Sequence, residues 1–412
     1  MQASLSISSF NRIKQVPCVV ARSNKQWVGT CLYHKRDRLT YDKGYKQVAK
    51  RIANIRFDPN QAKGDFMRKK CITGVGCVLF ILCGLLIFCS LSNVLRRKTA
   101  GETDQIHSFY SVEKNSLDVL FIGSSHLYYG VQPNVLWKEQ GITSYVMGSP
   151  EQTAATSYFL LKEAFRYQKP KVVAMESYYL WNKKLYNSEE RLRQAFDGMR
   201  LDGVKVEMLK TMLPDTEWKE LFTYLVPFVK YHSRWQELEN KDFHSNNFQK
   251  GARIDYTVTE LDNPGIPENA ASVPENSLFY IKKIEELCKE NGAEFMMFAV
   301  PFGIETDQER YDRRQGLNLT LEKELQEDGV PFLFYQRDNP EVIDFETDFR
   351  DKTHLNTYGA EKLTVHLGAY LAETYELEDH RTDTAYASWN EDLEEYETEA
   401  AKLRENPVDT AD

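Results

Sequence analysis

A run of 25 residues without a charged side chain, from Cys71 to Leu95, divides the chain into a short part and a long part. A helix crosses the hydrocarbon core of a bilayer with about 20 apolar residues, so this run is long enough. It is too long for the core of a typical signal peptide, and Ser90-Leu-Ser-Asn-Val94 offers only a poor cleavage site. We therefore expect an uncleaved signal anchor over residues 67–98. A buried core helix is the alternative interpretation, although such a helix rarely lacks a polar face.

The charges on either side of this run predict its orientation. Residues 1–70 carry 16 Lys and Arg against 4 Asp and Glu, whereas the whole chain has a net charge of −9. Arg68-Lys-Lys70 precedes the run and Arg96-Arg-Lys98 follows it. Because the larger positive excess precedes the run, we expect a single-pass protein of the cell membrane with a cytoplasmic N-terminus and an extracytoplasmic domain. Cys288 is the only cysteine after the run, so that domain has no internal disulfide, which is ordinary for a bacterial envelope protein.

Residues 1–66 form a basic N-terminal segment without periodicity or a motif. Met67-Arg-Lys-Lys70 followed by an apolar run is typical of the natural start of a signal-anchored protein. Lys63-Gly-Asp-Phe-Met67 can be encoded as AAA-GGA-GAT-TTT-ATG, which places a purine-rich ribosome-binding sequence before an ATG. We therefore interpret residues 1–66 as an over-extended gene start, with a genuine cytoplasmic tail as the alternative. A nucleic-acid-binding arm is disfavoured because the charge is dispersed, and no nucleic-acid partner is expected.

After the run, short apolar segments alternate with helical patterns, which predicts an α/β fold with a parallel sheet and helices on both faces. Residues 99–116 are polar and predict a stalk. Residues 180–272 are rich in aromatic and charged residues and interrupt the alternation, so we expect a helical insertion that covers the site. Residues 376–412 have 13 acidic and 3 basic side chains, which predicts a solvated helix or a disordered tail. The expected strands are 117–122, 142–147, 171–177, 294–301 and 331–335, and the main expected helices are 153–167, 275–291, 307–327 and one after residue 354.

Two distant segments carry reactive side chains. One is a buried strand that ends in the turn Gly123-Ser124-Ser125, and the other is Asp351-Lys-Thr-His354, just before a predicted helix. Ser125, His354 and Asp351 supply a nucleophile, a general base and a group that orients the base. Ser124 is a competing nucleophile. The non-catalytic alternative is a serine that caps a helix or lies in a turn, together with a surface aspartate and a capping histidine.

These segments resemble the SGNH (GDSL-type) hydrolase superfamily over residues 115–375. There the serine follows the first strand in a Gly-Asp-Ser turn, and Asp-x-x-His lies in the last motif. Here Ser124 stands in place of the usual Asp, and the family register selects Ser125 as the nucleophile. Gly359-Ala-Glu-Lys362 also matches the helix opening that follows this motif in the family. The resemblance implies a flavodoxin-like three-layer domain over residues 117–375.

The variant turn is more similar to the membrane-anchored acyl-transfer branch, which includes proteins of teichoic-acid D-alanylation and alginate acetylation. That resemblance implies an O-acyltransferase whose Ser125 passes an acyl group to a cell-envelope polysaccharide or a teichoic-acid-like acceptor. It also implies a multi-pass membrane O-acyltransferase as partner. The alternatives are an esterase or deacylase of envelope esters and a non-catalytic envelope scaffold. A scaffold has no need to keep Ser125, Asp351 and His354 together.

The resemblance further implies that the backbone N–H groups of Ser125 and Gly148 form an oxyanion hole. The Gly-x-Asn-Asp motif of the hydrolytic members is absent, which leaves Asn182, after the third strand, as the candidate third donor.

Ligands bind at the carboxyl ends of strands in such sheets, so His126, Glu176 and Tyr178 are candidate substrate-binding residues. For Glu176 the alternative is a core-edge carboxylate paired with a lysine, and for Tyr178 it is a half-buried core aromatic. The sequence has no zinc motif, P-loop or dinucleotide fingerprint, so we expect neither a metal nor a cofactor.

Overall fold

A computed structural model of the chain describes residues 18–23, 26–31, 59–96, 104–243 and 247–406. It divides into two compact units, Met1–Gly84 and Leu85–Asp412. The first unit contains an antiparallel pair, β1 (Cys18–Ser23) and β2 (Gln26–Cys31), which the sequence analysis did not anticipate. The remainder of the predicted basic segment before residue 59, residues 99–103 of the predicted stalk and residues 407–412 of the predicted tail lie outside the described residues.

The apolar run lies in helix α2 (Pro59–Leu95). Within this helix, Ile72–Leu95 forms a segment of 24 residues, and none of its most apolar stretch is buried inside the protein. By length and composition the segment is able to cross a membrane. A membrane anchor and a signal sequence both meet this criterion.

The second unit is built on a five-stranded parallel sheet with the order β4-β3-β5-β6-β7. In order along the chain this is the 2-1-3-4-5 arrangement of flavodoxin-like sheets. The predicted α/β class with a parallel sheet is therefore confirmed. The strands are β3 (Val119–Gly123), β4 (Ser144–Gly148), β5 (Val172–Glu176), β6 (Glu294–Ala299) and β7 (Phe332–Phe334).

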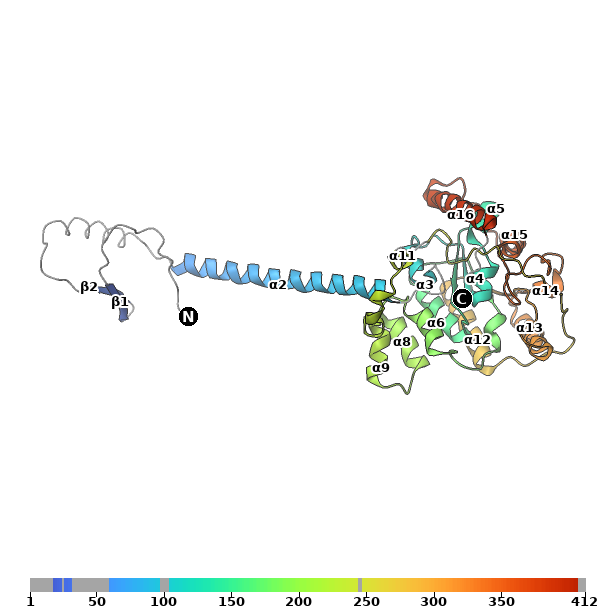
Figure 1. Cartoon of the computed structure of the whole chain (residues 1–412), viewed down its shortest axis with the longest axis horizontal. Helices are drawn as coiled ribbons and strands as arrows, with labels where there is room; N and C mark the ends of the chain where they lie inside the picture. Colours follow the sequence, from blue (N-terminus) through green and yellow to red (C-terminus); the bar gives the residue numbers. More distant parts are fainter. Residues whose placement is uncertain (1–17, 24–25, 32–58, 97–103, 244–246, 407–412) are drawn as a thin grey trace. The chain divides into compact units, whose positions relative to one another are not determined.

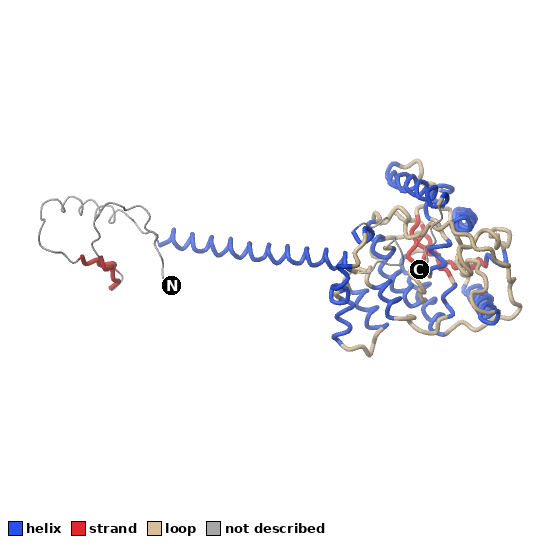
Figure 2. Tube along the Cα trace, viewed as in Figure 1, coloured by secondary structure: helices blue, strands red, loops and turns tan. Residues whose placement is uncertain are grey.

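Helices cover both faces of this sheet (Figure 2). Successive residues of β3 point to opposite faces, so Leu120 and Ile122 belong to one core cluster and Val119 and Phe121 to the other. Burial on both faces explains why the strand reads as a continuous apolar run. The first cluster takes residues from α6 (Ala154–Ala164), α12 (Glu275–Asn291) and α13 (Gln308–Asp328), and the second from α4 (Ser125–Gly130), α5 (Pro133–Gln140) and α15 (Thr357–Thr374).

The predicted insertion lies between β5 and α12, and only its first part is helical. Its second part, from residue 247, is an extended return segment. The Val146 N–H, on edge strand β4, donates to the Lys250 carbonyl at 2.9 Å, and the Thr259 N–H donates to the Phe349 carbonyl at 2.8 Å. The return segment therefore reaches the loop that precedes α15. The helices of the insertion and its approach are η2 (Tyr178–Trp181), α7 (Glu189–Phe196), α8 (Gly203–Met212), α9 (Trp218–Leu225), α10 (Pro227–Tyr231), η3 (His232–Gln236) and α11 (Asn240–Phe243).

Of the two forms expected for residues 376–412, the disordered tail is wrong for the described part, and the helix that is present there has a buried face. Helix α16 (Ala387–Glu405) lies beside α5 (Figure 1), and Trp389, Tyr396 and Ala400 are buried. Together with half-buried Leu393, these residues recur at helical spacing and form one apolar stripe. Although residues 376–412 are acidic in composition, α16 has an apolar face that packs on the domain.

The expectation of a polar stalk over residues 99–116 is also wrong for its described part. Helix α3 (Gln105–Ser108) is followed directly by a 3-10 turn, and Ile106 and Phe109 are buried in the main core. The Tyr145 hydroxyl donates to the Gln105 carbonyl at 2.8 Å. Residues 104–116 therefore belong to the α/β domain.

Candidate active site

Ser125, the predicted nucleophile, is the first residue of α4 and lies directly after the turn that leaves β3. Ser124 caps this helix, since its side chain accepts a hydrogen bond from the His126 N–H. Gly123 permits the turn, because a Cβ atom there would lie 2.7 Å from the Cβ atom of Glu176. Ser125 is thus at the carboxyl edge of the sheet between β3 and β5, the switch point where such folds bind ligands.

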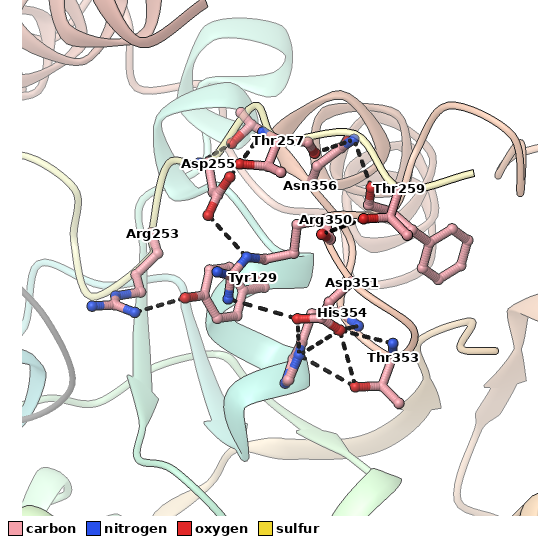
Figure 3. Close-up of polar contacts among 12 residues, drawn as sticks. Tyr129, Arg253, Asp255, Thr257, Thr259, Arg350, Asp351, Thr353, His354 and Asn356 are labelled. Carbon is pink, nitrogen blue, oxygen red and sulfur yellow. Dashed lines mark hydrogen bonds and ion pairs between the residues drawn. The ribbon is translucent and has the colours of Figure 1, made fainter. Parts of the chain in front are cut away.

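The structure brings Ser125, His354 and Asp351 together. The Nε2 atom of His354 lies 2.8 Å from the Oγ atom of Ser125, although the two residues are 229 positions apart. On the other side of the ring, Nδ1 lies 2.9 Å and 3.1 Å from the carboxylate oxygens of Asp351 (Figure 3). These contacts form one continuous chain from the carboxylate to the hydroxyl, as nucleophilic catalysis by serine requires.

The ionisation state of Asp351 determines which atom donates in each of these hydrogen bonds. Burial favours the protonated acid, but the hydrogen bond and charge of His354 outweigh it and lower the pKa of Asp351 well below its usual range. The N–H groups of Thr353 and His354 also donate to the carboxylate, at 2.8 Å and 2.9 Å. An ionised Asp351 accepts from Nδ1–H, which leaves Nε2 of His354 as the acceptor for the Ser125 hydroxyl.

Buried Asn356 fixes the loop that carries the base. Its amide donates to the carbonyls of Thr347 at 2.8 Å and Thr257 at 3.1 Å. Its side-chain oxygen accepts from the Gly359 N–H at 3.1 Å and so caps α15. Through Thr257, the return segment of the insertion holds this loop in place (Figure 3).

A buried ion pair supports the same loop and was missed by the sequence analysis. Nε of Arg350 lies 2.8 Å from a carboxylate oxygen of Asp255, on the return segment. The Arg350 guanidinium lies over the Tyr129 ring, 4.4 Å from its centroid, and 3.7 Å from the Asp351 carboxylate. No motif marks these residues, because they meet only through the path of the return segment.

Glu176 lies behind the turn of Ser124 and Ser125. Its carboxylate accepts a 2.9 Å hydrogen bond from the Ser124 hydroxyl and another from the Tyr178 N–H. Burial raises the pKa of Glu176 to about 7, and these hydrogen bonds oppose the shift only in part. The side chain is 2% exposed and is not among those that line the cavity described below. Among the described residues no lysine pairs with it, so the position fits neither of the alternatives considered from the sequence.

His126 and Tyr178 lie together at the cavity. Their rings stack with centroids 3.3 Å apart, and the His126 ring lies 4.6 Å from that of His354. His126 is 1% exposed, and within the described part of the chain neither of its ring nitrogens has a hydrogen-bond partner. Burial, and then the charge of His354, lower the pKa of His126 well below its usual value. Arg314, which the sequence analysis did not single out, donates to the Tyr178 hydroxyl.

Two of the candidate oxyanion donors differ in their position relative to Ser125. Gly148 pairs in register with Gly123, and a Cβ atom on it would lie 3.4 Å from the Ser124 carbonyl oxygen. It therefore borders the turn of Ser125. Asn182 instead uses its side-chain oxygen to accept from the Lys184 N–H at 2.9 Å, and it does not line the cavity.

A cavity of about 1620 Å³ opens at Ser125 and His354. Ligand pockets usually measure about 300–1,000 Å³, so this one is large enough for an extended ligand. In the described part of the chain, no group of three His, Cys, Asp or Glu side chains is arranged to hold a metal ion. Besides Ser125 and His354, the lining includes His126, Tyr178, Tyr179, Trp181, Glu189, Arg191, Arg193, Lys230, Tyr231, Ser233, Arg234, Glu237, Asp242, Glu305 and Arg314.

No protein-family model and no curated protein matches the sequence. Among solved structures, a GDSL-like lipase from Bacteroides thetaiotaomicron aligns with a TM-score of 0.33 and 13% identity, over 65% of this chain and 94% of that one. A putative acylhydrolase from Bacteroides fragilis aligns with a TM-score of 0.34 and 11% identity, over 65% and 93%. A gut microbial diltiazem-metabolizing enzyme aligns with a TM-score of 0.22 and 16% identity, over 67% and 49%. At these values the similarities assign neither an activity nor a substrate to this chain.

Proposed function

We propose that this protein is a membrane-anchored SGNH-type O-acyltransferase that works through an acyl-enzyme on Ser125. The observation that carries the proposal is the chain of contacts from Asp351 through His354 to Ser125, with 2.8 Å between Nε2 and Oγ. A serine hydroxyl needs an adjacent base to become a nucleophile, and the base needs a fixed tautomer. The positions of His354 and Asp351 relative to Ser125 support both requirements.

In the proposed reaction, Oγ of Ser125 attacks the carbonyl carbon of an acyl donor while its proton passes to Nε2 of His354. The tetrahedral intermediate collapses, and the leaving group departs with that proton. The acceptor hydroxyl then gives its proton to His354 and attacks the acyl-serine, after which Ser125 regains its proton. Backbone N–H groups of Ser125 and Gly148 are the proposed donors to the oxyanion. Asn182 is not used, because it does not line the cavity that contains Ser125.

The cavity favours a large polar acceptor. Its lining combines the aromatic rings of Tyr178, Tyr179 and Trp181 with charged groups of both signs, and its volume is about 1620 Å³. Aromatic faces and hydrogen-bonding groups together suit a carbohydrate or another polyhydroxyl chain. A cell-envelope polysaccharide or a teichoic-acid-like polymer is therefore the proposed acceptor, and a multi-pass membrane O-acyltransferase is the proposed source of the acyl group.

An esterase acting on envelope esters is the second candidate. The His354 side chain is 21% exposed in a broad cavity, so water can reach the acyl-serine. Transfer requires a bound acceptor that competes with this water by its position.

The location follows from α2. We propose that Ile72–Leu95 anchors the chain in the cell membrane, with the N-terminus in the cytoplasm and the catalytic domain outside, as the excess of basic residues before the span favours. Protease added to intact spheroplasts should digest the domain after residue 96. A protected domain would reverse the orientation.

Partition of the acyl group distinguishes transfer from hydrolysis. The full chain in detergent micelles is supplied with p-nitrophenyl acetate, with and without envelope oligosaccharides, and acetylated sugar and free acetate are quantified. We expect slow release of p-nitrophenol and acetyl transfer to sugar that exceeds hydrolysis. Fast hydrolysis that no oligosaccharide alters would favour the esterase, and Ser125→Ala is the inactive control.

A further inference from the structure

Exposed apolar side chains of the second unit are concentrated in one part of the insertion. Outside α2, nine large apolar side chains are exposed in the described residues, and five of them lie between positions 218 and 243. Their exposed fractions range from 39% to 68%. Single exposed apolar residues need no explanation, whereas a concentration of this kind marks an interaction site. The five residues are Trp218, Phe222, Val229, Trp235 and Phe243.

Helix α9 carries two of these exposed residues on an apolar stripe that its own domain covers only in part. Trp218, Leu221, Phe222 and Leu225 recur at helical spacing and form one apolar stripe. Leu221 and Leu225 pack against the main core, whereas Trp218 and Phe222 remain exposed with ring centroids 6.2 Å apart. The stripe is therefore wider than the core that it covers, and its outer edge remains exposed.

The segment that follows α9 contacts the last turns of the proposed membrane helix. The rings of Phe228 and Phe88 lie 5.1 Å apart, and the Phe228 N–H donates to the Ser92 hydroxyl at 3.2 Å. Arg234 donates to the carbonyls of Leu95 and Arg96, each at 2.9 Å. A guanidinium there satisfies carbonyls that the end of a helix leaves unpaired, and it complements the helix dipole.

These contacts set the position of the segment along the axis of α2. Phe88 precedes Leu95 by seven residues, or about 10 Å along the helix axis. In a helix that crosses the hydrocarbon core and ends at Leu95, Phe88 lies inside the apolar layer, and Phe228 lies beside it. Tryptophan, tyrosine and basic side chains are enriched at this boundary, where ring and charge meet lipid and headgroup.

We propose that residues 218–243 form an interfacial collar that is seated in the lipid leaflet through which α2 leaves the membrane. The proposal of a collar depends on the proposed membrane anchoring, because the collar contacts the lipid that surrounds the anchor. Trp218, Phe222 and Trp235 enter the boundary between headgroups and acyl chains, and Lys230, whose side chain is 44% exposed, faces the headgroups. Lys230, Tyr231, Ser233 and Arg234 also line the cavity that contains Ser125. The cavity therefore opens at the membrane surface and suits a substrate that is held there.

Quenching of tryptophan fluorescence by lipid tests the collar. The full chain is reconstituted in nanodiscs whose phosphatidylcholine is brominated near the headgroup end of its acyl chains, and in unbrominated nanodiscs. Wild-type fluorescence should be quenched by the brominated lipid, and most of that quenching should be lost in the double variant Trp218→Phe, Trp235→Phe. Trp181→Phe, which changes a tryptophan at the cavity, is the matched control and should leave the quenching unchanged.

Two outcomes separate the collar from the anchor. Equal quenching in the wild type and the double variant, in a chain that resists alkaline carbonate extraction from membranes, overturns the collar and leaves the anchor intact. The exposed rings then belong to a protein partner that the nanodisc lacks. Release of the chain by carbonate overturns the anchor, and the collar with it.

Discussion

The hydroxyl of Ser124 donates a hydrogen bond of 2.9 Å to the carboxylate of Glu176, directly behind the proposed nucleophile. The same carboxylate accepts from the Tyr178 N–H, which belongs to the segment that leaves β5. Glu176 thus ties the turn after β3 to the turn after β5. Because both oxygens accept from fixed donors, we expect this carboxylate to set the position of Ser125 without touching the substrate.

The pH dependence of stability provides a test of this arrangement. Burial raises the pKa of Glu176 from an ordinary value of 4.5 to about 7. Between these values the folded protein keeps a proton that the unfolded chain has lost, so this stabilisation is present at low pH and is lost as the pH rises through 7. The loss corresponds to about 3 kcal/mol.

Denaturant unfolding of the full chain in micelles at pH 5 and pH 8 measures the effect. Wild type should lose stability over this interval relative to Glu176→Gln, whose side chain does not titrate. Glu294→Gln, at the exposed start of β6, should behave as wild type does. Parallel pH profiles for wild type and Glu176→Gln would show that Glu176 does not titrate in this range.

Asn356 should be essential to the loop that carries His354. Asn356→Ala removes the cap of α15 and leaves the Thr347 and Thr257 carbonyls without their donor. We expect a loss of about 2–4 kcal/mol in the free energy of unfolding and a lower rate of serine labelling. Asn291→Ala, which removes an exposed side-chain hydrogen bond at the end of α12, is the control and should change neither quantity measurably. An active, stable Asn356→Ala protein would contradict the role of this residue.

The strands and the proposed catalytic residues were accessible from the sequence, for different reasons. Parallel strands buried on both faces are short apolar runs bounded by turns, so β3 to β7 were predicted near their observed positions. Ser125, Asp351 and His354 were recognised because their chemistry is complementary, and no periodicity indicated that they meet. Glu176 was predicted only in part. The sequence indicates that it lies at a strand end, but it does not indicate that the side chain lies on the side of the turn away from the cavity.

Contacts that depend on the path of an irregular segment could not be predicted. Asp255 and Arg350 are ordinary charged residues in the sequence, and they meet only because the return segment passes beside the loop before α15. Helix α16 is a different case, since Trp389, Leu393, Tyr396 and Ala400 already carry a helical apolar stripe. The acidic composition outweighed that signal in the sequence analysis.

Helix α16 should contribute to the stability of the domain. Trp389 is 4% exposed, and its ring lies 5.6 Å from that of Trp137. Trp389→Ala should lower the free energy of unfolding by about 3–5 kcal/mol because it leaves a cavity between α16 and α5. Leu201→Ala, at a position that is 65% exposed and outside the collar, should change the stability in micelles by less than about 0.5 kcal/mol. Equal effects of the two substitutions would mean that α16 does not pack on the domain in solution.

Labelling of the full chain by a fluorophosphonate probe tests the central claim most directly, because the probe reacts with an activated serine. Wild type should be labelled on a peptide that contains Ser125. Ser125→Ala should abolish labelling with little change in thermal stability, His354→Ala should nearly abolish it, and Ser124→Ala should retain part of it. Labelling that survives Ser125→Ala and disappears in Ser124→Ala, or a wild type that is never labelled, would contradict the assignment of Ser125 as the nucleophile.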